Sequence, residues 1–67
     1  MSINAVLIDD ELHNIENLRQ LLKRHCPELM VTGTATHVDS ALVLIRQQQP
    51  AIVFLDIQMP IRTALNC

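Results

Sequence analysis

Two apolar segments of this 67-residue chain each run directly into acidic residues. Residues 5–8 lead into Asp9 and Asp10, and residues 51–55 lead into Asp56. Three carboxylates that pack together repel one another, so they either raise their pKa values or recruit a cation. Mg²⁺ is a hard ion that prefers oxygen ligands and suits such a site. A phosphoryl group beside the ion has its charge neutralised, which favours attack by the Asp56 carboxylate to form an aspartyl phosphate.

The same acids also have a purely structural interpretation. An Asp that follows a strand is often only a helix N-cap or a turn residue. For Asp10 taken alone, just before the helical pattern that starts at Leu12, the cap interpretation is the better one. It does not explain why an acidic pair and another acid stand at equivalent strand ends. The whole layout therefore favours a chemical site.

The elements that must position these acids follow from the apolar pattern. Continuous apolar stretches indicate strands that are buried on both faces, and spacings of three and four indicate helices. We expect strands at 3–8, 29–35 and 51–55, a helix at 12–25, and a second helix that ends before Pro50. This order predicts an α/β fold in which right-handed helical crossovers join parallel strands. With sheet order 2-1-3, the acidic ends of the first and third strands converge at the switch in strand order.

The helical patterns also predict which side chains face the sheet. We expect Asp39 or a neighbour to cap the second helix. The apolar positions expected to face inward are Leu12, Ile15, Leu18 and Leu22 in the first helix, and Ala41, Leu42 and Ile45 in the second.

Composition argues against several classes of protein. Hydrophobic residues make up 49% and charged residues 18%, which is typical of a globular chain. Its five basic residues are scattered, so we expect no direct nucleic-acid binding by this segment. Apolar runs reach only about five residues, whereas a membrane span needs roughly 20, and residues 1–4 carry no signal-peptide features. We therefore expect a cytoplasmic protein, with Cys26 and Cys67 as free thiols.

Two segments of the chain resemble a known family. Residues 6–11, Val-Leu-Ile-Asp-Asp-Glu, are similar to the opening of the receiver domains of two-component response regulators. Residues 54–60, Phe-Leu-Asp-Ile-Gln-Met-Pro, are similar to the segment that carries the phosphoacceptor in that family. The resemblance covers residues 3–60, and it implies a flavodoxin/CheY-like fold.

The resemblance also implies roles for individual residues. Asp56 would be the phosphorylated residue and Asp10 the direct Mg²⁺ ligand, with Asp9 acting largely through water. Gln58 would offer its main-chain carbonyl to the metal. The helix after Asp10 would be the surface that meets a sensor histidine kinase.

A finer resemblance, carried by residues 21–28 with Val31 and Gly33, is to receivers joined to a LytTR-type DNA-binding output, which this sequence does not contain. After Pro60 the chain departs from the family, whose members continue with an acidic–Gly loop. We therefore expect a partial receiver domain over 1–60, truncated after the third strand, and a non-matching tail over 61–67. The Ser/Thr and Lys that contact the phosphoryl group in the family are missing, so we expect slow or absent phosphorylation.

The leading interpretation is a phospho-receiver module, a signalling switch rather than an enzyme, that takes a phosphoryl group on Asp56 with Mg²⁺. One alternative is a phosphorylation-incompetent interaction fragment from a truncated or frameshifted gene. A less favoured alternative is an aspartyl-nucleophile phosphatase, a class that needs a second Asp where this chain has Gln58. The third strand is apolar throughout and would lie at a sheet edge, so we also expect self-association through it.

Overall fold

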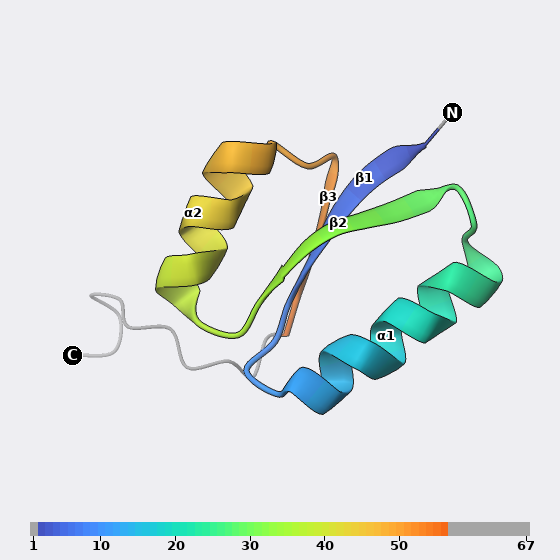
Figure 1. Cartoon of the computed structure of the whole chain (residues 1–67), viewed down its shortest axis with the longest axis horizontal. Coiled ribbons are helices and arrows are strands. Elements are labelled where there is room, and N and C mark those ends of the chain that lie inside the picture. Colours follow the sequence, from blue (N-terminus) through green and yellow to red (C-terminus); the bar gives the residue numbers. More distant parts are fainter. Residues whose placement is uncertain (1, 57–67) are drawn as a thin grey trace.

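The structure, a computed structural model, describes residues 2–56 as alternating strands and helices (Figure 1). The three strands form one parallel sheet in the order β2-β1-β3. This arrangement confirms the α/β class and the 2-1-3 order predicted from the sequence. The elements are β1 (Ile3–Ile8), α1 (Leu12–His25), β2 (Leu29–Ala35), α2 (Val38–Gln48) and β3 (Ile52–Leu55).

The central strand β1 forms the core of the molecule. Its last four residues, Ala5 to Ile8, are each no more than 3% exposed. Strands pair with β1 on both sides, and side chains of both helices cover its faces, so this stretch has to be apolar at every position. The continuous apolar run in the sequence is explained by this two-sided burial.

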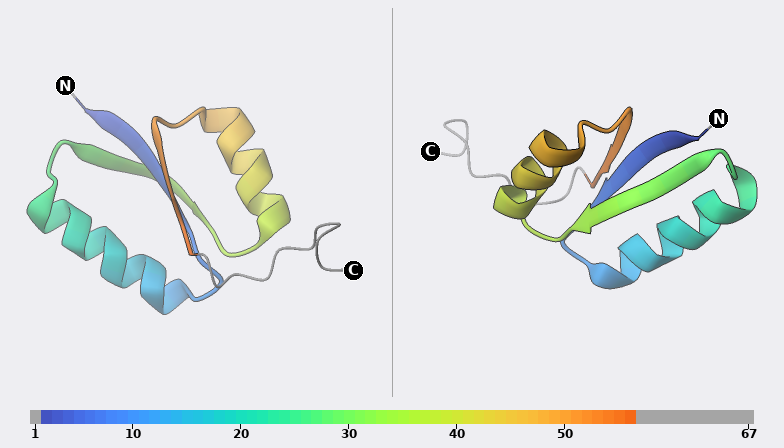
Figure 2. Two further views of the ribbon diagram at one scale, coloured as in Figure 1. Left: turned by 180° about the vertical axis from the view of Figure 1, so that it is seen from behind. Right: turned by 45° about the horizontal axis from the view of Figure 1, so that its top comes forward.

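The two helices lie on opposite faces of the sheet, as the views in Figure 2 show. Leu7 shares a pocket with Ile15 of α1. The next residue, Ile8, packs in a cluster with Ala41 of α2. Successive side chains of a strand point to opposite faces, so β1 supplies one side chain to each layer in turn.

Two of the inward-facing positions predicted for the helices are wrong. Leu12 is 63% exposed and Leu42 is 54% exposed. In α2 the inward position is taken by Leu44, which packs against the core cluster. Leu44 reaches close to the backbone at Gly33 of β2, where an added Cβ would stand 2.5 Å from Leu44 Cδ1. The helix therefore rests on a strand position that has no side chain.

The helix caps also differ from the prediction. The N-cap residues are Glu11 for α1 and His37 for α2, and neither side chain makes a capping hydrogen bond. Asp10 therefore does not cap α1, and Asp39 lies within the first turn of α2. At the other end of α2, Gln49 adopts a left-handed conformation with φ 44° and ψ 58°, and its N–H donates to the Ile45 carbonyl at 2.8 Å.

Strand β3 lies at one edge of the described sheet and is covered less completely than β1. Val53 is 40% exposed and Leu55 is 48% exposed. Between β3 and α2 lies a groove of about 220 Å³, here called the α2–β3 groove. All of its lining residues are apolar: Ile8, Val38, Ala41, Leu42, Ile45, Val53 and Leu55.

Candidate functional site

The carboxyl ends of β1 and β3 lie side by side because the two strands are parallel neighbours. The Asp56 N–H donates to the Ile8 carbonyl at 3.0 Å, which ties the residue after β3 to the end of β1. On the other side, the Asp9 N–H donates to the Ala35 carbonyl of β2 at 3.1 Å. Backbone hydrogen bonds thus bring together the points at which the acidic residues leave the sheet.

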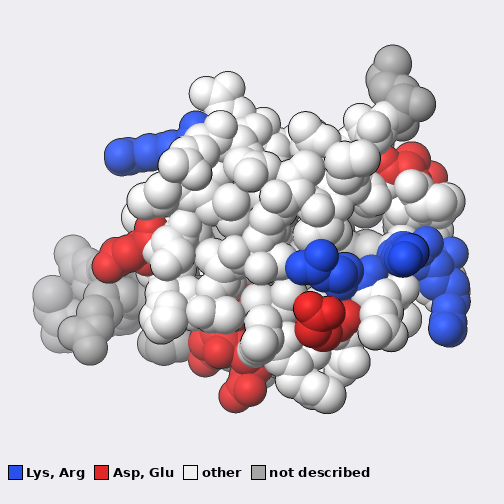
Figure 3. All heavy atoms as spheres, viewed as in Figure 1, with Lys and Arg blue, Asp and Glu red and all other residues white. Residues whose placement is uncertain are grey.

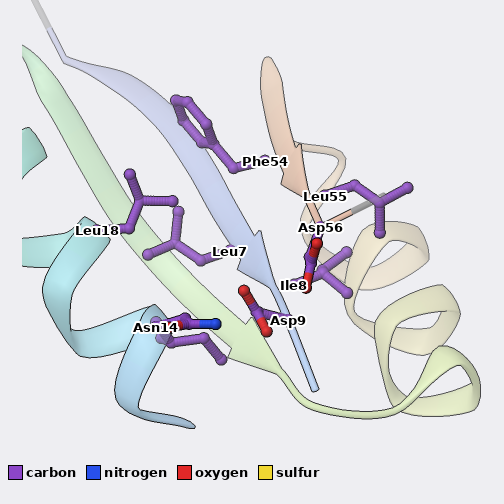
Figure 4. Close-up of a pocket in the computed structure, with 9 residues that line it drawn as sticks. Leu7, Ile8, Asp9, Asn14, Leu18, Phe54, Leu55 and Asp56 are labelled. Carbon is purple, nitrogen blue, oxygen red and sulfur yellow. The ribbon is translucent and has the colours of Figure 1, made fainter. Parts of the chain in front are cut away.

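Three aspartates gather at this end of the sheet. Oxygen atoms of Asp9, Asp10 and Asp56, one from each carboxylate, all lie within 4.8 Å of one another. The Asp9 and Asp56 side chains lie near one another at the ends of β1 and β3 (Figure 4). Asp9 and Asp56 are partly buried, whereas Asp10 is exposed. The three acids singled out in the sequence therefore form a single cluster.

Asp9 has a second, structural contact. Its Oδ1 accepts a hydrogen bond from the Glu11 N–H at 2.9 Å, which fixes the turn between β1 and α1. The turn interpretation considered for the acids after β1 therefore applies to Asp9. This hydrogen bond holds the Asp9 carboxylate in place beside the other two aspartates.

The electrostatics of the cluster are unfavourable to a third negative charge. Loss of hydration raises the pKa of Asp10 above its ordinary value, although this side chain is exposed. A hydrogen bond to Asp9 and the negative charge of Asp9 raise the same pKa further, with smaller contributions from Asp56 and Glu11. A cation among the three carboxylates would offset this repulsion, and oxygen donors of this kind match a hard divalent ion.

A pocket of about 340 Å³ opens beside Asp9 and Asp56. Asn14 of α1 lies at this pocket, with its side chain directed toward Asp9 (Figure 4). Asn14 was not among the site residues predicted from the sequence; it lies in the first turn of α1, four residues after Asp10. The remaining wall is largely apolar and is formed by Leu7, Ile8, Ile15, Leu18, Phe54 and Leu55.

Charge is distributed unevenly over the surface. Acidic side chains gather where β1 passes into α1, whereas the Lys and Arg of α1 lie over its C-terminal half and another basic side chain lies over α2 (Figure 3). The last turn of α1 contains Lys23, Arg24 and His25. No helix in the described part of the chain combines the length and the apolar character that crossing a membrane requires. Gln58, which was predicted to offer a main-chain carbonyl, lies outside the described residues, as does the segment 61–67.

Comparison with known proteins gives a consistent result. Residues 5–65 match the response regulator receiver domain. A response regulatory protein of Vibrio cholerae is 45% identical over 56 residues, which cover 84% of this chain and 22% of that protein. The sensory transduction protein LytT of Bacillus cereus is 39% identical over 57 residues, which cover 85% of this chain and 23% of that protein.

One relative carries the name of an enzyme. The protein-glutamate methylesterase/protein-glutamine glutaminase 2 of Nitratidesulfovibrio vulgaris is 38% identical over 58 residues, which cover 87% of this chain and 16% of that protein. This chain spans a quarter or less of the length of these three relatives. The shared part is therefore the receiver segment. The match over residues 5–65, together with response regulators of this identity, shows that the chain belongs to the response regulator receiver domain family of two-component signalling.

Proposed function

We propose that this chain is a phospho-receiver in which Asp56 accepts a phosphoryl group from a phosphohistidine of a sensor histidine kinase, with Mg²⁺ at the acidic cluster. The observation that carries the proposal is the approach of three carboxylates to within 4.8 Å at the ends of neighbouring strands. Ligands of open α/β sheets bind at this kind of strand-order switch. The family assignment supports the same chemistry.

The residues present fit a magnesium ion. Asp9, Asp10 and Asp56 offer hard oxygen donors, and Mg²⁺ keeps several waters when only a few carboxylates hold it. The main-chain carbonyl of Gln58 is a further proposed ligand. When bound, the ion would neutralise charge on the oxygens of the incoming phosphoryl group.

The proposed step is a transfer between two covalent carriers. An oxygen of the Asp56 carboxylate attacks the phosphorus atom, and a P–O bond forms as the P–N bond to the kinase imidazole breaks. The imidazole leaves with the electron pair of that bond, and Asp56 becomes an acyl phosphate. Because the phosphoryl group stays on the protein, we propose that the chain acts as a switch and turns over no other substrate.

The kinase would approach along α1, which starts beside the cluster. Leu12 is 63% exposed and Leu21 is 53% exposed on this helix, so α1 offers apolar side chains to a partner. Such exposed apolar positions on a helix next to a reactive centre suit a docking surface.

Labelling of the chain by acetyl phosphate or by a phosphorylated histidine kinase tests the proposal. Intact-mass spectrometry in Mg²⁺ should detect slow addition of one phosphoryl group. Asp56→Asn should abolish the addition, because an amide is not a nucleophile of this kind. The matched control Asp39→Asn removes an exposed carboxylate of α2 and should leave labelling unchanged.

Two other outcomes would count against the proposal. A label that persists in Asp56→Asn would move the nucleophile to another residue. A chain that binds Mg²⁺ but is never labelled would favour the second candidate, an interaction module that does not accept phosphate.

A further inference from the structure

We infer that Asn14 is a positioning residue of the acidic cluster, whose side-chain amide hydrogen-bonds to a water shared by Asp9 and the Mg²⁺ ion. This role rests on the magnesium site of the proposed function and adds a residue of α1 to that site. Asn14 lines the same pocket as Asp9 and Asp56, and its side chain is directed toward Asp9 (Figure 4). The amide therefore stands on the α1 side of the cluster.

Backbone hydrogen bonds link Asn14 to Asp9 through Glu11. The Glu11 N–H donates to Asp9 Oδ1 at 2.9 Å, and the Asn14 N–H donates to the Glu11 carbonyl at 3.1 Å. The next residue, Ile15, is 1% exposed and shares a pocket with Leu7 of β1, which anchors this turn of the helix on the sheet. The first turn of α1 thus holds Asn14 in place relative to the Asp9 carboxylate.

A carboxamide suits this position because the cluster already contains three acids. Loss of hydration and the neighbouring carboxylates raise the pKa of Asp10. A further carboxylate would add to the repulsion, whereas a neutral amide supplies both donors and an acceptor without charge. Mg²⁺ usually keeps several of its waters, and these waters need hydrogen-bond partners of their own. Asn14 is placed to be one of those partners.

The contact we infer is mediated by water rather than direct. Among residues 2–56, no hydrogen bond joins the Asn14 side chain to another group of the protein. Asp9 Oδ1 accepts the Glu11 N–H, and the Asp9 carboxylate has further lone pairs for a water or for the ion. A bridging water joins polar groups that face one another beyond direct hydrogen-bond distance.

The side-chain NMR signals of Asn14 test this role directly. The NH₂ group of each asparagine gives its own pair of peaks in proton–nitrogen correlation spectra of the full chain. On titration with MgCl₂, we expect the Asn14 pair to shift with the same apparent affinity as the backbone amides of Asp9, Asp10 and Asp56. The pair from Asn17 is the internal control and should not shift, because this residue lines a separate hollow formed by α1 residues alone.

Substitution gives a second readout. Asn14→Ala removes the amide and should weaken Mg²⁺ binding about ten-fold, at the lower end of the roughly 10–100-fold losses seen when groups that hydrogen-bond to metal ligands are removed. Ala has a higher helix propensity than Asn, so α1 should stay folded. Asn14→Gln keeps an amide on a longer side chain and should bind Mg²⁺ more tightly than Asn14→Ala. Asn17→Ala is the matched control and should bind as the wild type does.

The outcomes separate this role from the proposed function. Backbone shifts at Asp9, Asp10 and Asp56 without a shift of the Asn14 side chain would overturn the positioning role and leave the magnesium site standing. Equal affinities for the wild type and Asn14→Ala, or equal losses in Asn14→Ala and Asn17→Ala, would also overturn it. A chain with no Mg²⁺ response at all would contradict both the magnesium site and this role. The wild-type side-chain signals decide the question even where a variant fails to fold.

Discussion

β1 and β3 both end in the acids of the cluster, but they are held in different ways. β1 has neighbours on both sides, and Ala5 to Ile8 are no more than 3% exposed. β3 has a described neighbour on one side only, and Val53 and Leu55 are about half exposed. The strand that leads into Asp9 and Asp10 is therefore embedded in the core, whereas the strand that leads into Asp56 lies at the edge of the described sheet.

The acids of the proposed site are therefore held in place to different degrees. The two acids that follow β1 leave a strand whose position is fixed by burial. Asp56 follows a strand that has a described neighbour on one side only, and its N–H donates to the Ile8 carbonyl. Regions with few buried contacts open at lower free energy than the core does. We therefore expect the geometry at Asp56 to respond first when the protein is perturbed.

The largest expected effect comes from replacing one leucine by alanine in each of the two strands. Leu7→Ala in β1 removes a side chain that is 1% exposed and should lower the free energy of unfolding by about 2–5 kcal/mol. Leu55→Ala in β3 is the matched control and should cost roughly 1 kcal/mol or less, because that side chain is 48% exposed. Urea denaturation at low protein concentration measures both. Equal losses would contradict the contrast between the strands.

A smaller effect is expected at the connection that leads into β3. Gln49 has φ 44°, in a region that costs a non-glycine residue roughly 1–2 kcal/mol. Gln49→Gly should raise the free energy of unfolding by up to about 1 kcal/mol. Gln48→Gly, inside the last turn of α2, should instead lower it by about 0.5–1 kcal/mol. Thermal or urea unfolding would show whether the two changes have opposite signs.

The smallest expected effect is a dependence on pH at the acidic cluster. The pKa of Asp10 is raised in the folded chain, so ionisation of this carboxylate lowers the free energy of unfolding at pH values above that pKa. The lost stability returns as the pH falls through the folded-state pKa toward the lower pKa of the unfolded chain. Without divalent ions, Asp10→Asn should therefore raise Tm at neutral pH and have less effect in acid. Asp39→Asn, outside the cluster, should give no such gain. A lower Tm for Asp10→Asn at neutral pH would show that its carboxylate stabilises the apo fold.

Much of the fold could be predicted because its strongest signals are local. The runs at 3–8 and 29–35 match β1 and β2, and Pro27 and Pro50 mark the ends of the helices. The periodic pattern did not distinguish Leu42 from Leu44 as the inward position of α2. That choice depends on Gly33, a residue of another element whose missing side chain lets Leu44 approach.

The candidate site could likewise be predicted where the signal lies in the local sequence, but not where it depends on the tertiary structure. Acidic residues after apolar strands could be recognised from the sequence alone, and the 2-1-3 order brought them together in the expected way. The cap interpretation, which suited Asp10 only when it was taken alone, does not apply, because the N-cap position of α1 is Glu11 and the carboxylate that accepts the Glu11 N–H belongs to Asp9. Asn14 was missed because its place at the pocket depends on how α1 leaves the sheet.

The central claim is that Asp9, Asp10 and Asp56 act together as one Mg²⁺ site. Titration of the chain with Mg²⁺, followed through its backbone amide NMR signals, tests this most directly. We expect the amides around these three residues to shift together with one weak affinity, and Asp10→Asn to abolish the response. Shifts scattered evenly over the surface, or a response that survives in Asp10→Asn, would contradict the account.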